Sequence, residues 1–352
     1  MKISIEVGHP SHIYYWKNVI RLLRQRGHDI QLFAREKEIV LHILRASGFD
    51  FQVVGSSKPT LLWKVVDLPF EDFRVLRLAR KKGIEFMLST GIPSSAHASR
   101  ILNVPHVSLI DTEIAKYGRL LVEPFSDAIC TPACFTARVD PSKHIPFNGY
   151  LELMYLHPKY FSPDSSVLEL IGLRRGDPFI IVRFSSWDSS HDVGKLKGVI
   201  ASDADRYQLV KHLSEKYQVF LTSEIPLPDQ FERFKLKLSP EKFHDLLAFA
   251  SLYIGEGAKT ASEAGVLGIP WVYISNSRRG YLDDQERKYF LGKTVSSIEE
   301  ARKVAERLLD KSEPEWRMKQ KEKLLTDTID VTQFMTNLVD NWPESMISLR
   351  SK

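Results

Sequence analysis

The first half of the chain alternates short apolar segments with segments of helical periodicity. Residues 3–7 alternate apolar and polar side chains, and apolar side chains then recur at helical spacing from Ile13 to Leu23. The same pattern predicts further strands at 28–34, 51–54, 84–88, 104–110, 128–130 and 143–147. It predicts further helices at 37–46, 70–82 and 93–102. This alternation is typical of βαβ units, which build parallel sheets with helices on both faces.

The alternation is interrupted at 150–177, a stretch with two prolines and two glycines. It resumes with strands predicted at 179–182, 218–221, 252–254 and 271–274. Helices are predicted between and after these strands, at 203–216, 240–249, 259–267, 297–309 and 315–341. We therefore predict an α/β protein with two doubly wound, Rossmann-like domains that face each other across a cleft.

The domain boundaries are predicted from these interruptions. The first domain covers 1–155, a linker covers 156–177, the second domain covers 178–312, and helices at 313–352 return towards the first domain. The length of 352 residues agrees, because a single core rarely grows that large. Ligands of doubly wound sheets bind outside the carboxyl ends of the strands, which is where we expect the site.

Composition excludes several classes of protein. The 49 Lys and Arg residues against 44 Asp and Glu residues give a net charge of +5, too diffuse for a nucleic-acid binder. Two cysteines, Cys130 and Cys134, cannot form a disulfide framework or, at their spacing, a zinc site, so core thiols are expected. No apolar run is long enough to span a bilayer, and the N-terminus runs into a strand and a turn, not a signal peptide. We expect a cytoplasmic protein.

The segment 255–270 carries the most specific chemistry. A strand ends at Gly255, and Glu256 and Gly257 lead into a helix that contains Lys259, Thr260 and Glu263. Glycines allow close backbone approach, and free N–H groups at a helix N-terminus suit a diphosphate. A plain βαβ crossover explains the glycines equally well on composition alone.

Five stretches, at 8–12, 109–113, 182–194, 238–247 and 255–270, resemble the domain-of-unknown-function family 354, which is GT-B-like. The last stretch also resembles the donor-binding motif of GT-B glycosyltransferases and UDP-N-acetylglucosamine 2-epimerases. The resemblance implies a GT-B-like fold and a nucleotide-diphosphate sugar, UDP-linked, as substrate. It implies that Glu263 binds the nucleotide ribose and that no metal or further cofactor is needed.

The loop after strand 179–182 is rich in hydroxyl groups and is predicted to serve the same site. Its polar side chains suit phosphate oxygens, and its tryptophan can stack on a base or sugar. These candidates are Arg183, Ser185, Ser186, Trp187, Ser189, Ser190, His191 and Gly194.

Candidate catalytic residues lie in the first domain. His12 follows the first strand, where a histidine can act as a base or orient a hydroxyl near neutral pH. The alternative is that His12 caps the next helix while His9 is a solvated turn residue, and the functional interpretation is slightly favoured. Asp111 and Glu113 close the strand at 104–110 and suit acceptor binding or proton transfer. A helix N-cap explains this segment equally well.

Two other charged features receive structural interpretations. The basic residues between Arg74 and Lys82 are expected to form a solvated helix face, with peripheral contact to an anionic membrane as the alternative. Asp203 and Asp205 resemble a metal-binding pair, but they open a predicted helix and fit a cap better.

The function predicted from the resemblance is a nucleotide-sugar-dependent glycosyltransferase in prokaryotic polysaccharide or glycoconjugate assembly. The second domain would hold the nucleotide, and the first would bind an acceptor and supply the base. A UDP-sugar 2-epimerase and a non-catalytic nucleotide-sugar-binding protein are the alternatives, because a fold does not establish a function. The acceptor, the donor's base and sugar, and the oligomeric state stay open.

Overall fold

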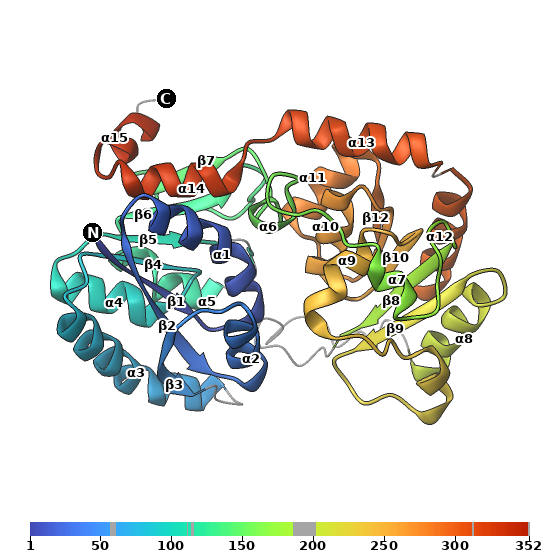
Figure 1. Ribbon diagram of the computed structural model, residues 1–352, viewed down its shortest axis with the longest axis horizontal. Helices are drawn as coiled ribbons and strands as arrows, with labels where there is room; N and C mark the ends of the chain where they lie inside the picture. The colour runs from blue at the N-terminus through green and yellow to red at the C-terminus, as the bar shows by residue number, and fades with distance from the viewer. Residues whose placement is uncertain (57–60, 111, 114–115, 186–201, 312, 351–352) are drawn as a thin grey trace. The chain divides into compact units, whose positions relative to one another are not determined.

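The computed structural model describes residues 1–352 except 57–60, 111, 114–115, 186–201, 312 and 351–352. The chain forms two compact units (Figure 1). Unit 1 comprises Met1–Tyr155 and Ile329–Lys352, and unit 2 comprises Leu156–Thr328. No helix in the described part of the chain is long and apolar enough to cross a membrane.

Unit 1 is a doubly wound α/β domain with a parallel sheet. The strands follow the order β3-β2-β1-β4-β5-β6-β7. Its strands are β1 (Lys2–Val7), β2 (Asp29–Glu36), β3 (Phe51–Ser56), β4 (Phe86–Ser89), β5 (His106–Leu109), β6 (Ala128–Pro132) and β7 (His144–Phe147). Its helices are α1 (Pro10–Gln25), α2 (Glu38–Ala46), α3 (Leu61–Lys82), α4 (Pro93–Leu102), α5 (Lys116–Leu120), η1 (Glu123–Phe125), α14 (Val331–Asp340) and α15 (Glu344–Arg350), and α6 (Leu153–Leu156) ends at the boundary.

The helices of unit 1 cover both faces of its sheet. Helices α1, α2 and α14 lie on one face, and α3 and α4 on the other (Figure 1). Helix α1 buries Ile13, Trp16, Ile20 and Leu23, the residues whose spacing predicted it. Trp16 Nε1 also donates to Thr90 Oγ1 at 2.9 Å, which ties α1 to the loop after β4.

Unit 2 repeats this architecture with a five-stranded parallel sheet in the order β12-β11-β10-β8-β9. Its strands are β8 (Phe179–Phe184), β9 (Gln218–Ser223), β10 (Leu252–Gly255), β11 (Trp271–Ile274) and β12 (Gly292–Val295). Its helices are α7 (Ser166–Glu169), α8 (Asp203–Leu213), η2 (Asp229–Phe234), η3 (Pro240–Lys242), α9 (Phe243–Leu247), α10 (Ala258–Leu267), α11 (Gly280–Tyr289), α12 (Ile298–Lys311) and α13 (Pro314–Asp327). Helices α8 and α12 pack together, as do α10, α11 and α13.

The C-terminal segment differs from the sequence prediction. One helix was expected at 315–341, but the structure has two, α13 and α14, separated by an extended Thr328. Asp330 caps α14 by accepting a hydrogen bond from the Gln333 N–H at 2.9 Å, and the Ile329 N–H bonds to the Asn148 carbonyl. These contacts satisfy the backbone better at this point than a continued helix would.

Helix α8 begins with a capping box in which one of the two acidic residues expected to cap it, Asp205, takes part, whereas Asp203 pairs with Arg206. Ser202 is the N-cap, and its side chain accepts a hydrogen bond from the Asp205 N–H while Asp205 accepts from the Ser202 N–H. Among the residues that the structure describes, no group of three or more His, Cys, Asp or Glu side chains is placed to hold a metal ion. Cys130 is buried in unit 1, as expected of a core thiol, and burial raises its pKa to about 12. Cys134 is only half-buried, so it is not the core thiol expected from the sequence.

His106 is buried at the start of β5 with both ring nitrogens hydrogen-bonded. Ser126 Oγ donates to the Val122 carbonyl, so His106 Nδ1–H donates to Ser126 Oγ, at 2.8 Å. Nε2 therefore accepts from Ser89 Oγ, at 3.0 Å. Burial lowers the pKa of His106 to about 3, so the folded protein holds the neutral ring.

We expect His106 to make unit 1 less stable in acid. Unfolded, the ring binds a proton below its ordinary pKa of 6.5, whereas the folded ring does so only near pH 3. Its contribution is therefore fully present above pH 6.5 and is lost as the pH falls towards 3. Between about pH 7 and about pH 5 the loss is on the order of 2 kcal/mol. Urea unfolding at both pH values measures it.

The variant His106→Gln should lose this part of the acid dependence, although it is less stable at neutral pH. His42→Gln, at an exposed position on α2, is the matched control and should keep the full dependence. An acid dependence equal in wild type and His106→Gln would contradict the prediction.

Candidate functional site

The central strands of unit 2 meet at a topological switch point. Strand β8 pairs with β9 on one side and with β10 on the other, and the next strand, β11, lies beyond β10. The chain therefore leaves β8 and β10 in opposite directions at the carboxyl edge of the sheet. Doubly wound sheets bind ligands at such a point. Two segments predicted from the sequence begin at this switch point. They are the loop that starts at Ser185 and the turn Gly255–Gly257.

The turn needs both of its glycines. A Cβ on Gly255 would lie 2.1 Å from the backbone oxygen of Arg183, and a Cβ on Gly257 would lie 2.9 Å from the Tyr253 hydroxyl. Tyr253 is buried, which raises the pKa of its hydroxyl, and this hydroxyl donates to the Gly257 carbonyl at 3.0 Å. The turn is therefore held tightly against the sheet edge. Sequence reasoning missed Tyr253, because in a buried strand it is indistinguishable from a core residue.

Helix α10 starts directly after this turn and has no side-chain cap. Gly257 is the N-cap residue and offers no side chain to the N–H groups of the first turn. Lys259 is half-buried and Thr260 is buried in that first turn. Backbone N–H groups at such a helix start, together with the helix dipole, form a favourable environment for an anion.

Glu263 lies on the second turn of α10 and is buried. Its Oε1 lies 3.1 Å from Nε2 of His244, which is also buried and belongs to α9. The sequence predicted Glu263 as a ligand-binding carboxylate but gave His244 no role. His244 lies inside the stretch 238–247 that resembles the family, and this resemblance could have pointed to it. Its pairing with Glu263 could not be predicted, because the two residues are 19 positions apart in the sequence.

Glu256 is bound inside the protein by Arg206. The carboxylate accepts from Arg206 Nε and Nη2 at 2.8–3.1 Å and from the Ser185 N–H at 3.0 Å. The Glu256 and Arg206 side chains are only 1% and 8% exposed. Glu256 thus holds the turn and the start of the next loop together, which differs from the nucleotide-binding role expected from the sequence.

Ser185 and Arg183 flank the turn. The hydroxyl of Ser185 is buried and has no hydrogen-bond partner among the described residues. Arg183 is half-buried, and its Cδ would lie 3.1 Å from a Cβ on Gly257. Its Nη2 lies 2.6 Å from Glu224 Oε1, so the guanidinium lies beside the turn and is partly neutralised by this pair.

Several predicted residues lie outside the described part of the chain. They are Asp111 and, in the loop after β8, Ser186, Trp187, Ser189, Ser190, His191 and Gly194.

Unit 1 has its own switch point, between β1 and β4. The segment Gly8–His12 follows β1, and His12 is half-buried in the first turn of α1, where Nδ1 accepts from the Gly8 N–H at 3.3 Å. The capping role suggested as an alternative for His12 belongs to His9, whose Nδ1 accepts from the Ser11 N–H at 3.3 Å. His12 is thus placed beside the loop that begins at the carboxyl edge.

Glu113 follows β5, the strand next to β4. It is half-buried, and its Oε1 accepts from the Thr136 N–H at 3.4 Å. This contact ties Glu113 to the segment after β6 near the same edge of the sheet.

A buried polar network that the sequence did not predict lies beneath the Gly8 turn. Glu6, in β1, accepts from the hydroxyls of Ser94 and Ser95 at 2.7 Å each. Arg35 pairs with Glu71 at 2.9 Å and lies 3.6 Å from Glu6. Burial raises the pKa of Glu71, while Arg35 opposes this shift. The available signal was Glu6 itself, a carboxylate within an otherwise apolar strand.

Comparison with known proteins shows the fold. The UDP-N-acetylglucosamine 2-epimerase from Neisseria meningitidis, bound to UDP-N-acetylglucosamine, is 11% identical with a TM-score of 0.69 over 97% of this chain and 100% of that chain. The spinosyn forosaminyltransferase SpnP is 14% identical with a TM-score of 0.65, and the glycosyltransferase VinC, in complex with dTDP, is 12% identical with a TM-score of 0.61. Both comparisons cover 100% of each chain.

These similarities confirm the predicted GT-B-like architecture of two Rossmann-like units and, at such identities, nothing beyond the fold. No curated protein sequence matches the chain significantly. One family model, described as protein of unknown function (DUF354), matches residues 1–342. Because this match spans nearly the whole sequence and agrees with the resemblance found in five of its stretches, the chain belongs to the DUF354 family.

Proposed function

We propose that the chain is a metal-independent, GT-B-type glycosyltransferase that uses a nucleotide-diphosphate sugar, UDP-linked, in polysaccharide or glycoconjugate assembly in the cytoplasm. One observation carries this proposal. The turn Gly255–Gly257 leads into the uncapped start of α10 at the switch point of unit 2, and buried Glu263 lies one turn further along the same helix. The diphosphate of a nucleotide would fit the start of α10, and the ribose of the same nucleotide would fit Glu263.

The proposed donor contacts follow from this geometry. The first N–H groups of α10 and the Ser185 hydroxyl, which has no partner among the described residues, would hold the diphosphate, with Arg183 adding positive charge. Glu263 would accept hydrogen bonds from the ribose hydroxyls, with His244 fixing the direction of its carboxylate. When the sugar is transferred, the bond from its anomeric carbon to the diphosphate breaks, and dipoles fixed in advance would stabilise the charge that develops on the leaving group.

Unit 1 is proposed to bind the acceptor. The acceptor hydroxyl attacks the anomeric carbon and loses its proton to a base, for which His12 is the candidate, and Asp111 and Glu113 are candidates for orienting the acceptor. Similar folds that carry UDP-N-acetylglucosamine or dTDP support a nucleotide-sugar donor.

A UDP-sugar 2-epimerase is the second candidate. It is favoured by the number of epimerases among the similar structures and by a carboxylate, Glu113, at the carboxyl edge of the sheet in unit 1. An epimerase would use such carboxylates to move protons on the sugar.

A turnover assay separates the candidates. The protein is incubated with each UDP-sugar, with and without a mixture of acceptor glycans, and the products are followed by NMR. Release of UDP that depends on the acceptor supports the transferase, and conversion of one free UDP-sugar into its 2-epimer supports the alternative. Tight binding without either product leaves a nucleotide-sugar-binding protein and contradicts both enzymatic proposals.

His12→Ala should lower turnover while leaving the affinity for the nucleotide nearly unchanged. Loss of a general base costs about 100- to 10,000-fold in rate, whereas nucleotide binding is assigned to unit 2. Steady-state kinetics together with calorimetry of UDP binding measure both effects. His9→Ala is the matched control, since it changes the neighbouring capping residue. A His12→Ala protein with wild-type turnover would exclude His12 as the base.

A further inference from the structure

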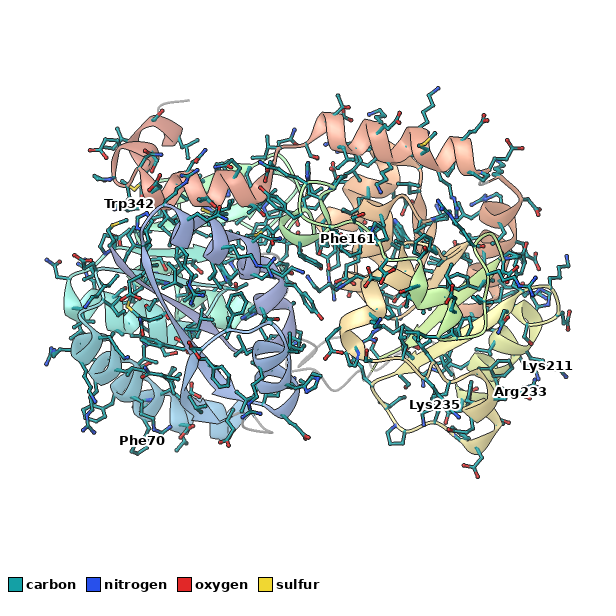
Figure 2. All side chains as sticks on the ribbon, viewed as in Figure 1. Phe70, Phe161, Lys211, Arg233, Lys235 and Trp342 are labelled. Atoms are coloured by element: carbon teal, nitrogen blue, oxygen red, sulfur yellow. The ribbon has the colours of Figure 1, made fainter. Side chains whose placement is uncertain are left out.

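Helix α3 presents large apolar side chains to the solvent. Val66, Phe70 and Phe73 recur at helical spacing on its outer face and are 50%, 60% and 63% exposed. The opposite face of the helix is buried through Val75 and Ala79. Figure 2 shows the Phe70 side chain at the outer surface of unit 1. The outer face therefore carries aromatic rings where a solvated helix has polar side chains.

A second exposed apolar segment is connected to α3 through α4. His97, on α4, lies 2.8 Å from Asp72 on α3 through Nδ1 and 2.9 Å from the Leu121 carbonyl through Nε2. Its ring also contacts Phe125 edge-on, with centroids 4.6 Å apart. These contacts hold the segment after α5 beside α3. We call the exposed apolar residues of both segments the apolar patch, namely Val66, Phe70, Phe73, Leu120, Leu121 and Phe125.

Positive charge adjoins the apolar patch on the same helix. The second half of the outer face of α3 carries exposed cations, and no ion pair engages them within the described part of the chain. These cations are Arg74, Arg77, Arg80 and Lys81. Two of the acidic residues of the helix are turned away from this face, since Glu71 is buried against Arg35 and Asp72 pairs with His97, while Asp67 is half-buried. The exposed face thus changes from aromatic to cationic along one helix.

We propose that this face of unit 1 docks on a membrane surface that contains anionic lipid. Aromatic and aliphatic side chains insert at the boundary between headgroups and acyl chains, while adjacent Lys and Arg side chains are attracted by lipid phosphates. A surface between two copies of the chain would bring these cations together, which repulsion disfavours. This inference rests on unit 1 alone and goes beyond the donor site of unit 2.

Vesicle co-sedimentation of the full chain tests the proposal. Phosphatidylcholine vesicles are compared with vesicles that also contain phosphatidylglycerol, at low and high salt. The wild type should prefer the anionic vesicles and lose this preference at high salt. Phe70→Ser combined with Phe73→Ser, and Arg77→Glu combined with Arg80→Glu, should each weaken binding by about tenfold or more.

Matched controls change the same chemistry on exposed positions of unit 2. Leu170→Ser with Met318→Ser removes comparable apolar surface, and Arg302→Glu with Arg307→Glu reverses two exposed charges on α12. Both controls should bind vesicles like the wild type. Circular dichroism checks that all variants are folded, which is expected because the changed side chains are exposed.

Three results would overturn the proposal. In the first, the wild type shows no preference for anionic vesicles. In the second, the phenylalanine variant binds anionic vesicles as tightly as the wild type, which would indicate nonspecific attraction of a basic protein. Alternatively, light scattering shows that the phenylalanine variant converts an oligomer into a monomer without changing vesicle binding, which would assign the apolar patch to self-association.

Discussion

Glu263→Gln should lower the affinity for a nucleoside diphosphate by about 10- to 100-fold. An ionised carboxylate accepts stronger hydrogen bonds from two ribose hydroxyls than an amide does. Glu263 is buried on α10 and held by His244, so the variant keeps the shape of the site and changes only the charge. Calorimetric titration with UDP measures the effect.

A ribose-specific comparison makes this prediction sharper. The difference between wild type and Glu263→Gln should shrink when 2′-deoxy-UDP replaces UDP, because one of the two hydroxyls is then missing. His244→Gln should act in the same direction with a smaller factor, since His244 positions the carboxylate. Glu315→Gln, at an exposed position on α13, is the matched control. Equal affinity of folded Glu263→Gln and wild type for UDP would remove Glu263 from the site.

Arg206→Leu should lower the free energy of unfolding by about 3–5 kcal/mol. The substitution leaves the Glu256 carboxylate, 1% exposed, without the cation that now binds it at 2.8 Å. It also removes the contact of the guanidinium with the Phe184 ring, whose centroid lies 5.2 Å away. Urea unfolding at neutral pH measures the loss.

Two further variants test the cause of this loss. Adding Glu256→Leu to Arg206→Leu removes both charges and should restore part of the stability. Arg233→Leu removes an exposed guanidinium that also lies over an aromatic ring, that of Phe234, and should cost less than about 1 kcal/mol. If the two single arginine variants lose equal stability, the buried pair does not stabilise the turn.

The sequence predicted the strands of both sheets better than the polar helices. Strand β11 is found at the predicted residues, because its four side chains are all buried and apolar. Strand β12 was missed because Gly292 suggests a turn, whereas a Cβ there would lie 2.0 Å from Trp271 Cδ2, so the strand needs the glycine. Helix α3 begins at Leu61, nine residues before the predicted start. The predicted helix began directly after Pro69, but this proline is exposed and lies inside the helix.

In the predicted site, too, some features could be predicted from the sequence and others could not. Local backbone features could be predicted, so the turn Gly255–Gly257 and the start of α10 lie at the carboxyl end of a strand as expected. Side-chain partners could not, because they come from distant parts of the chain. Glu256 pairs with Arg206, 50 residues away, and only the packing of α8 against the sheet brings them together. A buried carboxylate needs such a partner, but the sequence does not say which cation provides it.

The central claim is that unit 2 binds a nucleoside diphosphate at the start of α10. Its most direct test is a thermal unfolding screen of the full chain against UDP, dTDP, GDP, ADP and their sugars. A ligand that binds only the folded state stabilises it by about 2.7 kcal/mol at a hundred times its dissociation constant. The account predicts a saturable rise in Tm of several degrees with a nucleoside diphosphate, UDP first, that is smaller in Glu263→Gln at the same ligand concentration. An unchanged Tm with every nucleotide and nucleotide sugar at millimolar concentration would contradict it.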